Sequence, residues 1–196
     1  MTAFADQHEP LAAWQRALRG EAGYELTFRI AHEAGTIAAG IAFERYPRSA
    51  CGLVTYMVVA PEARQRGLGK RLLDDAVADL RSRGAVAVFG EVNDPRRERG
   101  HETADIAWTR LERNQRWGAR VANIRYLQPA LGAELERDRG LCLLVLDARD
   151  QTIAGATIKT FMRELFEVTE QTAPDEELRE ILDAIPERVP LVELAR

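Results

Sequence analysis

Two glycines and a cluster of basic side chains stand where a predicted strand passes into a predicted helix. Residues 58–80 read VVAPEARQRGLGKRLLDDAVADL, with Gly67 and Gly69 directly before an amphipathic stretch. Glycine allows the backbone to approach a ligand closely, and the first N–H groups of a helix lack intrahelical acceptors. The surrounding basic residues are Arg64, Arg66, Lys70 and Arg71. This combination of residues is typical of a site for a phosphate or a diphosphate.

The spacing excludes two familiar glycine-rich phosphate motifs. A nucleotide P-loop needs a glycine five residues before its final Gly-Lys pair and a Ser or Thr after it, but Arg64 and Arg71 occupy those positions. The dinucleotide fingerprint G-x-G-x-x-G needs a third glycine where this chain has Leu72. On these features alone, an anion site and a purely structural turn are equal alternatives.

The longer segment resembles the acyl-CoA-binding segment of the GNAT family of N-acetyltransferases. The pattern of that family is an apolar strand, a proline, and then R/Q-x-x-G-x-G/A at the start of a helix. In this chain the pattern reads VVAP over residues 58–61 and RQRGLG over residues 64–69. The resemblance extends over roughly residues 10–148 and leaves the C-terminal residues outside it.

The resemblance implies a coenzyme site with acetyl-CoA as co-substrate and without a metal. The diphosphate is expected on the amides of the glycine turn, and the pantetheine arm beside the strand that ends at Val59. In this family a bulge in that strand opens a gap for the thioester, whose carbonyl is then polarised by a backbone N–H near Val58 or Val59. The implied cofactor-binding residues are Met57, Val58, Val59, Arg64, Gln65, Arg66, Gly67, Leu68, Gly69, Lys70 and Asn114.

Acetyl transfer to an amine requires a base for the amine proton and an acid for the leaving thiolate. Glu91, at the end of the strand after the motif helix, is the leading candidate for the base, and the alternative is a glutamate that caps the following loop. His101 in that loop is a second candidate, although a loop histidine is more commonly just solvated.

The usual acid of the family is missing from its expected position. GNAT enzymes commonly carry a tyrosine four residues before a glycine that ends the next helix, and counting back from Gly118 gives Asn114. An asparagine donates hydrogen bonds but has no acidic proton. Tyr126, on the predicted strand that follows, is the candidate replacement, and the alternative is a packing aromatic.

Two functions are consistent with these residues. The first is an N-acetyltransferase that moves an acetyl group from acetyl-CoA to a primary amine of a small molecule or peptide by direct attack. The second is a weak or inactive acyl-CoA-binding module with a regulatory or interaction role, which the absence of the tyrosine favours. The sequence does not identify the acceptor amine.

The elements that must position these residues follow from hydrophobic periodicity. Leu11, Trp14 and Leu18 share one face of a predicted first helix, which Gly20 ends. Strands are predicted over residues 24–31, 37–46, 50–59, 85–92, 119–127 and 140–148. Helices are predicted over residues 68–83 and 104–117, and around Ile158–Leu165 and Leu178–Ile185. This order predicts an α/β protein with a GNAT-like mixed, mostly antiparallel sheet, helices on both faces and a C-terminal helical extension.

Composition narrows the class of protein further. The 196 residues are 46% hydrophobic and 30% charged, as in ordinary globular proteins. We expect an acyl-CoA-binding domain over residues 1–150 and a helical extension over 151–196, packed on the domain or at an oligomer interface. A net charge of −4 argues against nucleic-acid and membrane-surface partners.

The cysteines and the N-terminal sequence predict a cytoplasmic protein. Cys51 and Cys142 lie in apolar runs without metal-type spacing, so reduced core residues are expected. The first residues lack the pattern of a signal peptide, and no apolar run is long enough to cross a bilayer. GNAT proteins often form dimers, so a homodimer is an open alternative to a monomer.

Overall fold

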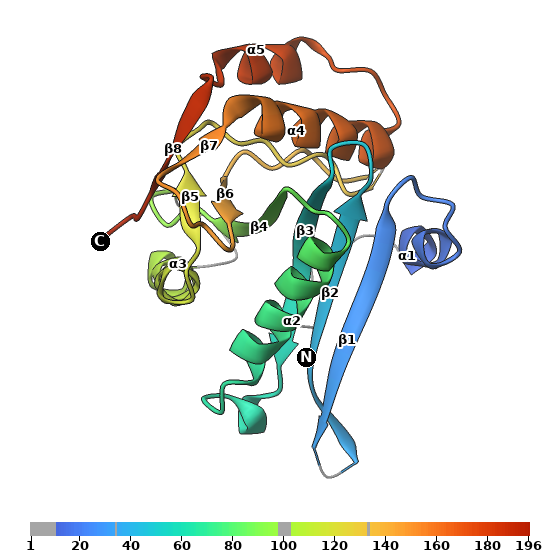
Figure 1. The fold of residues 1–196 in the computed structure, drawn as a ribbon, viewed down its shortest axis with the longest axis vertical. Coiled ribbons are helices and arrows are strands. Elements are labelled where there is room, and N and C mark those ends of the chain that lie inside the picture. The colour runs from blue at the N-terminus through green and yellow to red at the C-terminus, as the bar shows by residue number, and fades with distance from the viewer. Residues whose placement is uncertain (1–10, 34, 98–102, 133) are drawn as a thin grey trace. The chain divides into compact units, whose positions relative to one another are not determined.

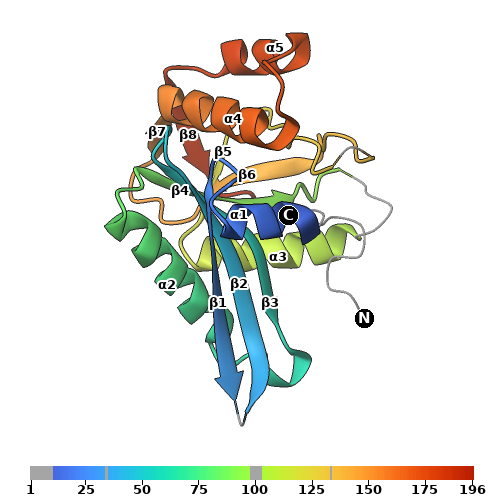
Figure 2. The same cartoon turned by 90° about the vertical axis from the view of Figure 1, so that its right-hand side faces the viewer.

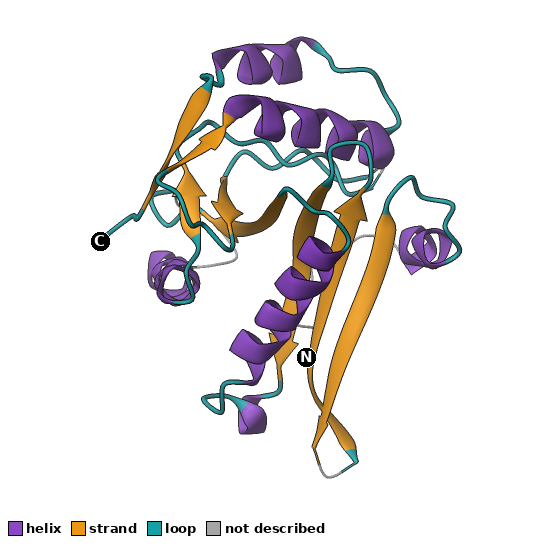
Figure 3. Ribbon diagram, in the orientation of Figure 1, coloured by secondary structure: helices purple, strands orange, loops and turns teal. Residues whose placement is uncertain are grey.

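The computed structural model describes residues 11–33, 35–97, 103–132 and 134–196. The chain divides into two compact units, Met1–Val88 and Phe89–Arg196, and each is described by itself. Figure 1 shows the first unit in blue to green and the second in green to red, and Figure 3 distinguishes the helices from the strands. Among the described residues, no helix is long and apolar enough to cross a membrane.

An antiparallel sheet forms the centre of the first unit. Its strands are β1 (Glu25–Glu33), β2 (Thr36–Tyr46) and β3 (Cys51–Val59), and β2 pairs with both of the others. A β-bulge interrupts the pairing of β2 with β3, because Ala42 lies opposite Tyr56 whereas Phe43 lies opposite Val54. The extra residue is Thr55, whose hydroxyl donates a hydrogen bond of 3.2 Å to the Ala42 carbonyl. The bulge therefore distorts β3 shortly before the segment that the resemblance assigns to the coenzyme.

Helices cover both faces of this sheet. In α1 (Leu11–Leu18), the ring of Trp14 contacts Phe28 of β1 edge-on, with centroids 5.5 Å apart. In α2 (Leu68–Ser82), Asp79 accepts a hydrogen bond of 3.0 Å from Arg29, the residue after Phe28. Since successive residues of a strand point to opposite faces, the two helices lie on opposite sides of β1, as Figures 1 and 2 show.

The prediction for the packed face of α1 was wrong in part. Leu11 and Leu18 are 68% and 60% exposed, whereas Ala17 is buried. Trp14 makes the aromatic contacts with the sheet, including one with Tyr56 at 5.3 Å. A helix this short presents only about one side chain per turn to a sheet, and the large indole takes that position.

The predicted ends of α2 agree with the structure. Its buried face includes Leu72, Leu73, Ala76 and Leu80. Gly84 follows the helix with a φ of 84°, which favours glycine. Gly52 of β3 makes room for α2, because a Cβ there would lie 2.6 Å from Cδ1 of Leu80. The missing side chain thus allows the helix to pack closely on the strand.

In the second unit, the strands are connected by antiparallel pairing in the order β4-β6-β5-β8-β7. Their bounds are β4 (Ala87–Asn93), β5 (Arg120–Ala122), β6 (Leu141–Val145), β7 (Thr152–Ala154) and β8 (Arg188–Val192), with β4 beginning in the last residues of the first unit. The helices are α3 (Ala104–Arg116), α4 (Gly155–Glu170) and α5 (Glu176–Ala184). Phe89 of β4 stacks on Phe161 of α4, with ring centroids 4.6 Å apart. Figures 1 and 2 show α5 alongside α4, with α3 on the other side of the strands.

The α/β class and the mostly antiparallel pairing that the sequence predicts are confirmed. Strands β7 and β8 were not predicted, because they are short and Pro190 interrupts the apolar pattern of β8. The strand predicted over 119–127 was too long, since it ends at Ala122. The backbone N–H of Asn123 donates to the Pro190 carbonyl and that of Ile124 to the Ala122 carbonyl, which turns the chain away. Tyr126 therefore lies on a loop and not on a strand.

Candidate functional site

The glycine turn of the first unit has an unusual backbone. Gly67 is the N-cap of α2 and has φ 79° and ψ 1°, in the left-handed region. Gln65, two residues earlier, also has a positive φ of 64°, a conformation that costs a non-glycine residue about 1–3 kcal/mol. A Cβ on Gly67 would meet no atom within 4 Å, so the space next to the turn is open.

Backbone donors at this turn are available to a ligand. The carbonyl of Gly67 accepts the helical hydrogen bond from Arg71 N–H at 3.0 Å. Within the described ranges, no residue accepts a hydrogen bond from the N–H groups of Leu68, Gly69 or Lys70. These groups form the first turn of a 15-residue helix, whose N-terminus carries a partial positive charge. The arrangement suits an anion such as a diphosphate.

The basic side chains of the turn are held by local contacts. Arg64 donates through Nε to the Val59 carbonyl at 3.2 Å. Arg66 lies 2.9 Å from Glu33, and Lys70 lies 2.5 Å from Asp74. Exposed ion pairs of this kind contribute about 0–1 kcal/mol each, so these cations are able to exchange their partners for a phosphate at small cost.

The β3 segment assigned to the coenzyme leads directly into this turn. Met57, Val58 and Val59 lie opposite Ile41, Gly40 and Ala39 of β2. The Val58 side chain is 44% exposed, although it lies in an apolar strand. An exposed apolar side chain here is compatible with the pantetheine contact that the sequence predicts.

In the second unit, Glu91 and Tyr126 are in direct contact. The phenol of Tyr126 donates a hydrogen bond of 2.5 Å to Oε1 of Glu91. The side-chain amide of Gln128 donates to Oε2 of the same carboxylate at 2.8 Å. We name these three residues the Glu91 cluster. Separate arguments from the sequence predicted Glu91 and Tyr126, and the structure brings them together.

Sequence reasoning did not find Gln128. The backbone of Gln128 forms a bridge with Asp138, through hydrogen bonds of 2.9 and 3.1 Å. Arg137, next to Asp138, is anchored to Glu170 of α4 by hydrogen bonds of 2.8 and 2.6 Å. The position of Gln128 therefore depends on contacts between segments distant in the sequence, and no local motif signals it.

The environment of Tyr126 favours its neutral form. The side chain is only 3% exposed. Burial, together with the charge of Glu91 and the hydrogen bond to it, raises the pKa of Tyr126 well above 10. The phenol consequently keeps its proton at neutral pH and directs it at the carboxylate. Each carboxylate oxygen has two lone pairs and can accept more than one hydrogen bond.

Among the candidates that the structure describes, Asn114 forms its side-chain hydrogen bond outside the Glu91 cluster. The Nδ2 of Asn114 donates to the Arg110 carbonyl at 2.9 Å, within α3. In the part of the chain that the structure describes, no hydrogen bond joins Asn114 to the Glu91 cluster. His101 lies outside the described residues. Cys51 and Cys142 are buried free thiols, as predicted for core residues.

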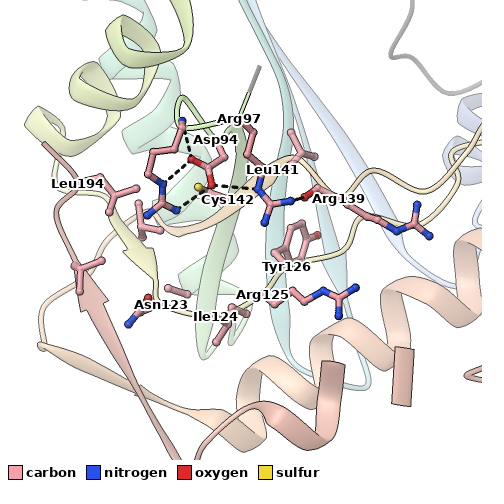
Figure 4. A pocket seen from close by; sticks show the side chains of 14 residues that line it. Asp94, Arg97, Asn123, Ile124, Arg125, Tyr126, Arg139, Leu141, Cys142 and Leu194 are labelled. Carbon is pink, nitrogen blue, oxygen red and sulfur yellow. Dashed lines mark hydrogen bonds and ion pairs between the residues drawn. The ribbon is translucent and has the colours of Figure 1, made fainter. Parts of the chain in front are cut away.

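A small polar pocket adjoins Tyr126 (Figure 4). It has a volume of about 60 Å³. Tyr126 lines it together with Asp94 after β4, Cys142 of β6 and Arg125 from the loop after β5. Figure 4 shows Arg97 and Asp94 on one side of the pocket and Arg125 on another. We name it the arginine pocket.

Comparison with known proteins identifies the family. The sequence profile of the Acetyltransferase (GNAT) family matches residues 2–104, more than half of the chain. The chain therefore belongs to the GNAT acetyltransferase family, whose members transfer an acetyl group from acetyl-CoA. No curated protein matches the chain.

Several solved structures are similar to this chain, and the first one described here agrees with its fold. A GNAT-family protein from Bacteroides thetaiotaomicron, named only as a possible acetyltransferase, has a TM-score of 0.55 and 19% identity over 76% of each chain. A similarly named GNAT protein from Desulfovibrio desulfuricans shares 23% identity over 69% of this chain and 77% of its own, with a TM-score of 0.46. An acetyltransferase from Bacillus subtilis in complex with CoA shares 17% identity over 68% of this chain and 81% of its own, also with a TM-score of 0.46.

Proposed function

We propose that this protein transfers an acetyl group from acetyl-CoA to a primary amine by direct attack of the amine on the thioester. The observation that carries the proposal is the Glu91 cluster, in which a carboxylate is oriented by hydrogen bonds to both of its oxygens. An oriented carboxylate is a suitable general base for an amine. Membership of an acetyltransferase family supplies the reaction class.

The glycine turn is the proposed coenzyme site. Its residues are Arg64, Gln65, Arg66, Gly67, Leu68, Gly69 and Lys70, with Met57, Val58 and Val59 for the pantetheine arm and Asn114 as a further contact. Support comes from the left-handed Gly67 and from the helix N–H groups without acceptors among the described residues. Backbone donors at a helix N-terminus bind phosphate groups well because the helix dipole adds to the hydrogen bonds.

In the proposed reaction, the amine nitrogen forms a bond to the acetyl carbon as the bond from carbon to sulfur breaks. Glu91 accepts the proton that the amine loses. Protonation removes the negative charge of Glu91, which is one of the causes of the raised pKa of Tyr126. Tyr126 then passes its proton to the thiolate and receives the proton held by Glu91, so the cluster returns to its initial state.

The second candidate function is an acyl-CoA-binding module without turnover. The observation that favours it is Asn114, which occupies the position of the usual acid and donates its amide hydrogen bond to its own helix. Under this alternative, the Glu91 cluster stabilises the second unit and has no role in proton transfer. Coenzyme binding is expected in both cases and does not separate the two functions.

A combined binding and turnover experiment separates them. Calorimetric titration with acetyl-CoA and CoA measures binding, and a free-thiol assay over a panel of amines measures transfer. We expect Glu91→Gln to lower kcat by about 10²–10⁴-fold, with an unchanged Kd for acetyl-CoA. Glu180→Gln, on the exposed side of α5, is the matched control and should retain full activity.

Each outcome selects one candidate function. Thiol release that depends on Glu91 supports the transferase. Tight binding of acetyl-CoA without thiol release from any amine favours the non-catalytic module. Equal activity of the parent and Glu91→Gln across pH excludes Glu91 as the base.

A further inference from the structure

The arginine pocket presents a concentration of positive charge that the proposed chemistry does not use. The side chains of Arg96, Arg97, Arg125 and Arg139 line it. Each is more than half exposed, so the guanidinium groups are accessible from solvent. Among the described lining residues, Asp94 is the acidic one. Four positive charges thus face one negative charge around a small volume.

Asp94 organises part of this charge. Its side chain is 8% exposed and accepts hydrogen bonds from Nε and Nη2 of Arg96 at 2.8 and 2.9 Å. Burial opposes ionisation of Asp94, but the hydrogen bonds from Arg96 and the charges of Arg96 and Arg97 outweigh it and lower the pKa. Asp94 is therefore ionised at neutral pH and fixes Arg96 at the pocket.

The remaining arginines are held less completely. Arg97 donates through Nη1 to the Arg139 carbonyl at 2.6 Å, and its Nε lies 3.7 Å from Oδ2 of Asp94, a looser ion pair than the 2.8 Å contact of Arg96 with the same carboxylate. Arg139 is paired with Glu177 at 2.7 Å, whereas Arg125 approaches the same glutamate only to 3.6 Å. Glu177, which is not among the residues that line the pocket, is thus the shared ion-pair partner of both arginines. Arg97 and Arg125 are the guanidinium groups best able to bind an added anion.

The buried thiol in the pocket does not offset this positive charge. Burial, followed by the charge of Asp94, raises the pKa of Cys142 to about 11. The thiol is therefore neutral at physiological pH and does not repel an anion. A volume of about 60 Å³ accommodates a few water molecules or a compact charged group.

We propose that the arginine pocket binds a compact oxyanion of the acceptor, a carboxylate or a phosphate, so that the substrates are amines that carry a negative charge. Guanidinium groups bind both oxyanions through paired hydrogen bonds. Tyr126 connects the pocket to the reaction, because it lines the pocket and its hydroxyl contacts Glu91. The inference rests on the proposed function and adds the substrate class to it.

The test compares amines that differ only in the oxyanion. The pairs are β-alanine with propylamine, γ-aminobutyrate with butylamine, and O-phosphoethanolamine with ethanolamine. We expect kcat/KM to be at least about tenfold higher for the charged member of a pair, since hydrogen bonds to charged groups are strong. Preference for the carboxylates or for the phosphate identifies which oxyanion the pocket takes, and either preference supports the proposal. Equal kcat/KM within all pairs overturns it.

Variants assign the effect to the pocket. Arg97→Gln, Arg125→Gln and the double variant should lower kcat/KM for the charged amines by at least about tenfold. The same variants should leave neutral amines and the Kd of acetyl-CoA unchanged. Arg163→Gln, at an exposed position of α4, is the matched control and should change neither value. A parallel loss for charged and neutral amines in the pocket variants contradicts a specificity role.

Direct binding separates this inference from the proposed function. Calorimetric titration of O-phosphoethanolamine and of β-alanine into the protein does not depend on turnover. Binding that Arg125→Gln weakens supports the pocket even if no amine is acetylated, in which case only the proposed function fails. Transfer to neutral amines without measurable binding of either charged probe contradicts the oxyanion-binding role of the arginine pocket. In that case the proposed transferase function still stands.

Discussion

Among single residues, Tyr126 combines deep burial with a contact to a charged group. A phenol in contact with Glu91 stabilises the carboxylate while the carboxylate disfavours the phenolate, and burial adds to this preference for the neutral form. The two groups therefore behave as a pair, and a substitution of either one changes the other. This coupling makes pH a useful probe of the cluster.

We expect Tyr126→Phe to lose about 1–3 kcal/mol in free energy of unfolding at pH 8, because Glu91 loses a buried donor. The pKa of Tyr126 is raised in the folded state, so its contribution is complete below pH 10 and decreases as the pH rises through the folded pKa. The difference between the parent and the variant should therefore narrow above pH 10. Urea unfolding of the parent and of Tyr126→Phe at pH 8 and at pH 10.5 measures this difference in free energy of unfolding. The same difference at both pH values would contradict the coupling of Tyr126 with Glu91.

Gly67 provides a second prediction for a single residue. Alanine in the left-handed region costs about 1–2 kcal/mol, and we expect Gly67→Ala also to raise the Kd for acetyl-CoA at least tenfold by displacing the turn. Gly84→Ala is the matched control, since Gly84 has a φ of 84° at the other end of α2 and equally open surroundings. Both variants should lose similar stability in thermal unfolding, but only Gly67→Ala should weaken binding in calorimetry. Equal affinity of the two variants for acetyl-CoA would show that the coenzyme does not bind at the Gly67 turn.

Among the elements, α4 begins at a point of close backbone packing. A Cβ on Gly155 would lie 1.9 Å from the carbonyl oxygen of Pro186, and Gly155 N–H donates to the Glu187 carbonyl at 2.7 Å. These contacts join the first turn of α4 to the chain just before β8. Because the obstructing atom belongs to the backbone, no rotation of a side chain relieves the overlap.

We therefore expect Gly155→Ala to destabilise the protein by about 3 kcal/mol or more, at the upper end of overpacking effects. Gly40→Ala serves as the control, because its Cβ would meet only the Arg29 carbonyl oxygen at an ordinary 3.7 Å. Differential scanning calorimetry should show a large loss of Tm for the first variant and little change for the second. Similar Tm values would show that the start of α4 adjusts freely.

In the molecule as a whole, the C-terminal residues take part in the second unit. Val121 and Ala122 of β5 lie opposite Val192 and Leu191 of β8. Phe161 stacks on Phe89, and Arg137 joins the loop that carries Gln128 to Glu170. We propose the limits 1–150 and 151–196 for the domain and its extension, with the extension packed on the domain through these contacts.

We expect a chain that ends at residue 150 to lose the native structure of the second unit, because Phe89 and β5 would be exposed. Circular dichroism and amide hydrogen exchange of the shortened chain should show unprotected β4 to β6. If these strands exchanged as slowly as in the full chain, the proposed packing of residues 151–196 on the domain would be contradicted. A role of these residues at an oligomer interface would then be favoured.

The sequence by itself determined those parts of the protein that depend on local patterns. Hydrophobic patterning predicted β1 to β4, as alternation in β1 and as nearly continuous apolar runs in β3 and β4. The spacing of leucines with Gly84 predicted α2 and its end. The glycine turn was predicted for the same reason, since its motif is contiguous and its backbone conformation depends on glycine at position 67. Glu91 and Tyr126 were each proposed from the chemistry that acetyl transfer requires.

Only the tertiary structure decided how these residues are combined. The contact of Glu91 with Tyr126 and Gln128, and the grouping of arginines from three segments around one pocket, depend on how loops return to the ends of strands. Strands β7 and β8 likewise form because partners are present, since three- and five-residue segments have little intrinsic preference for a strand. Periodicity reports which side of one element is buried, whereas contacts between distant segments depend on the packing of the whole unit.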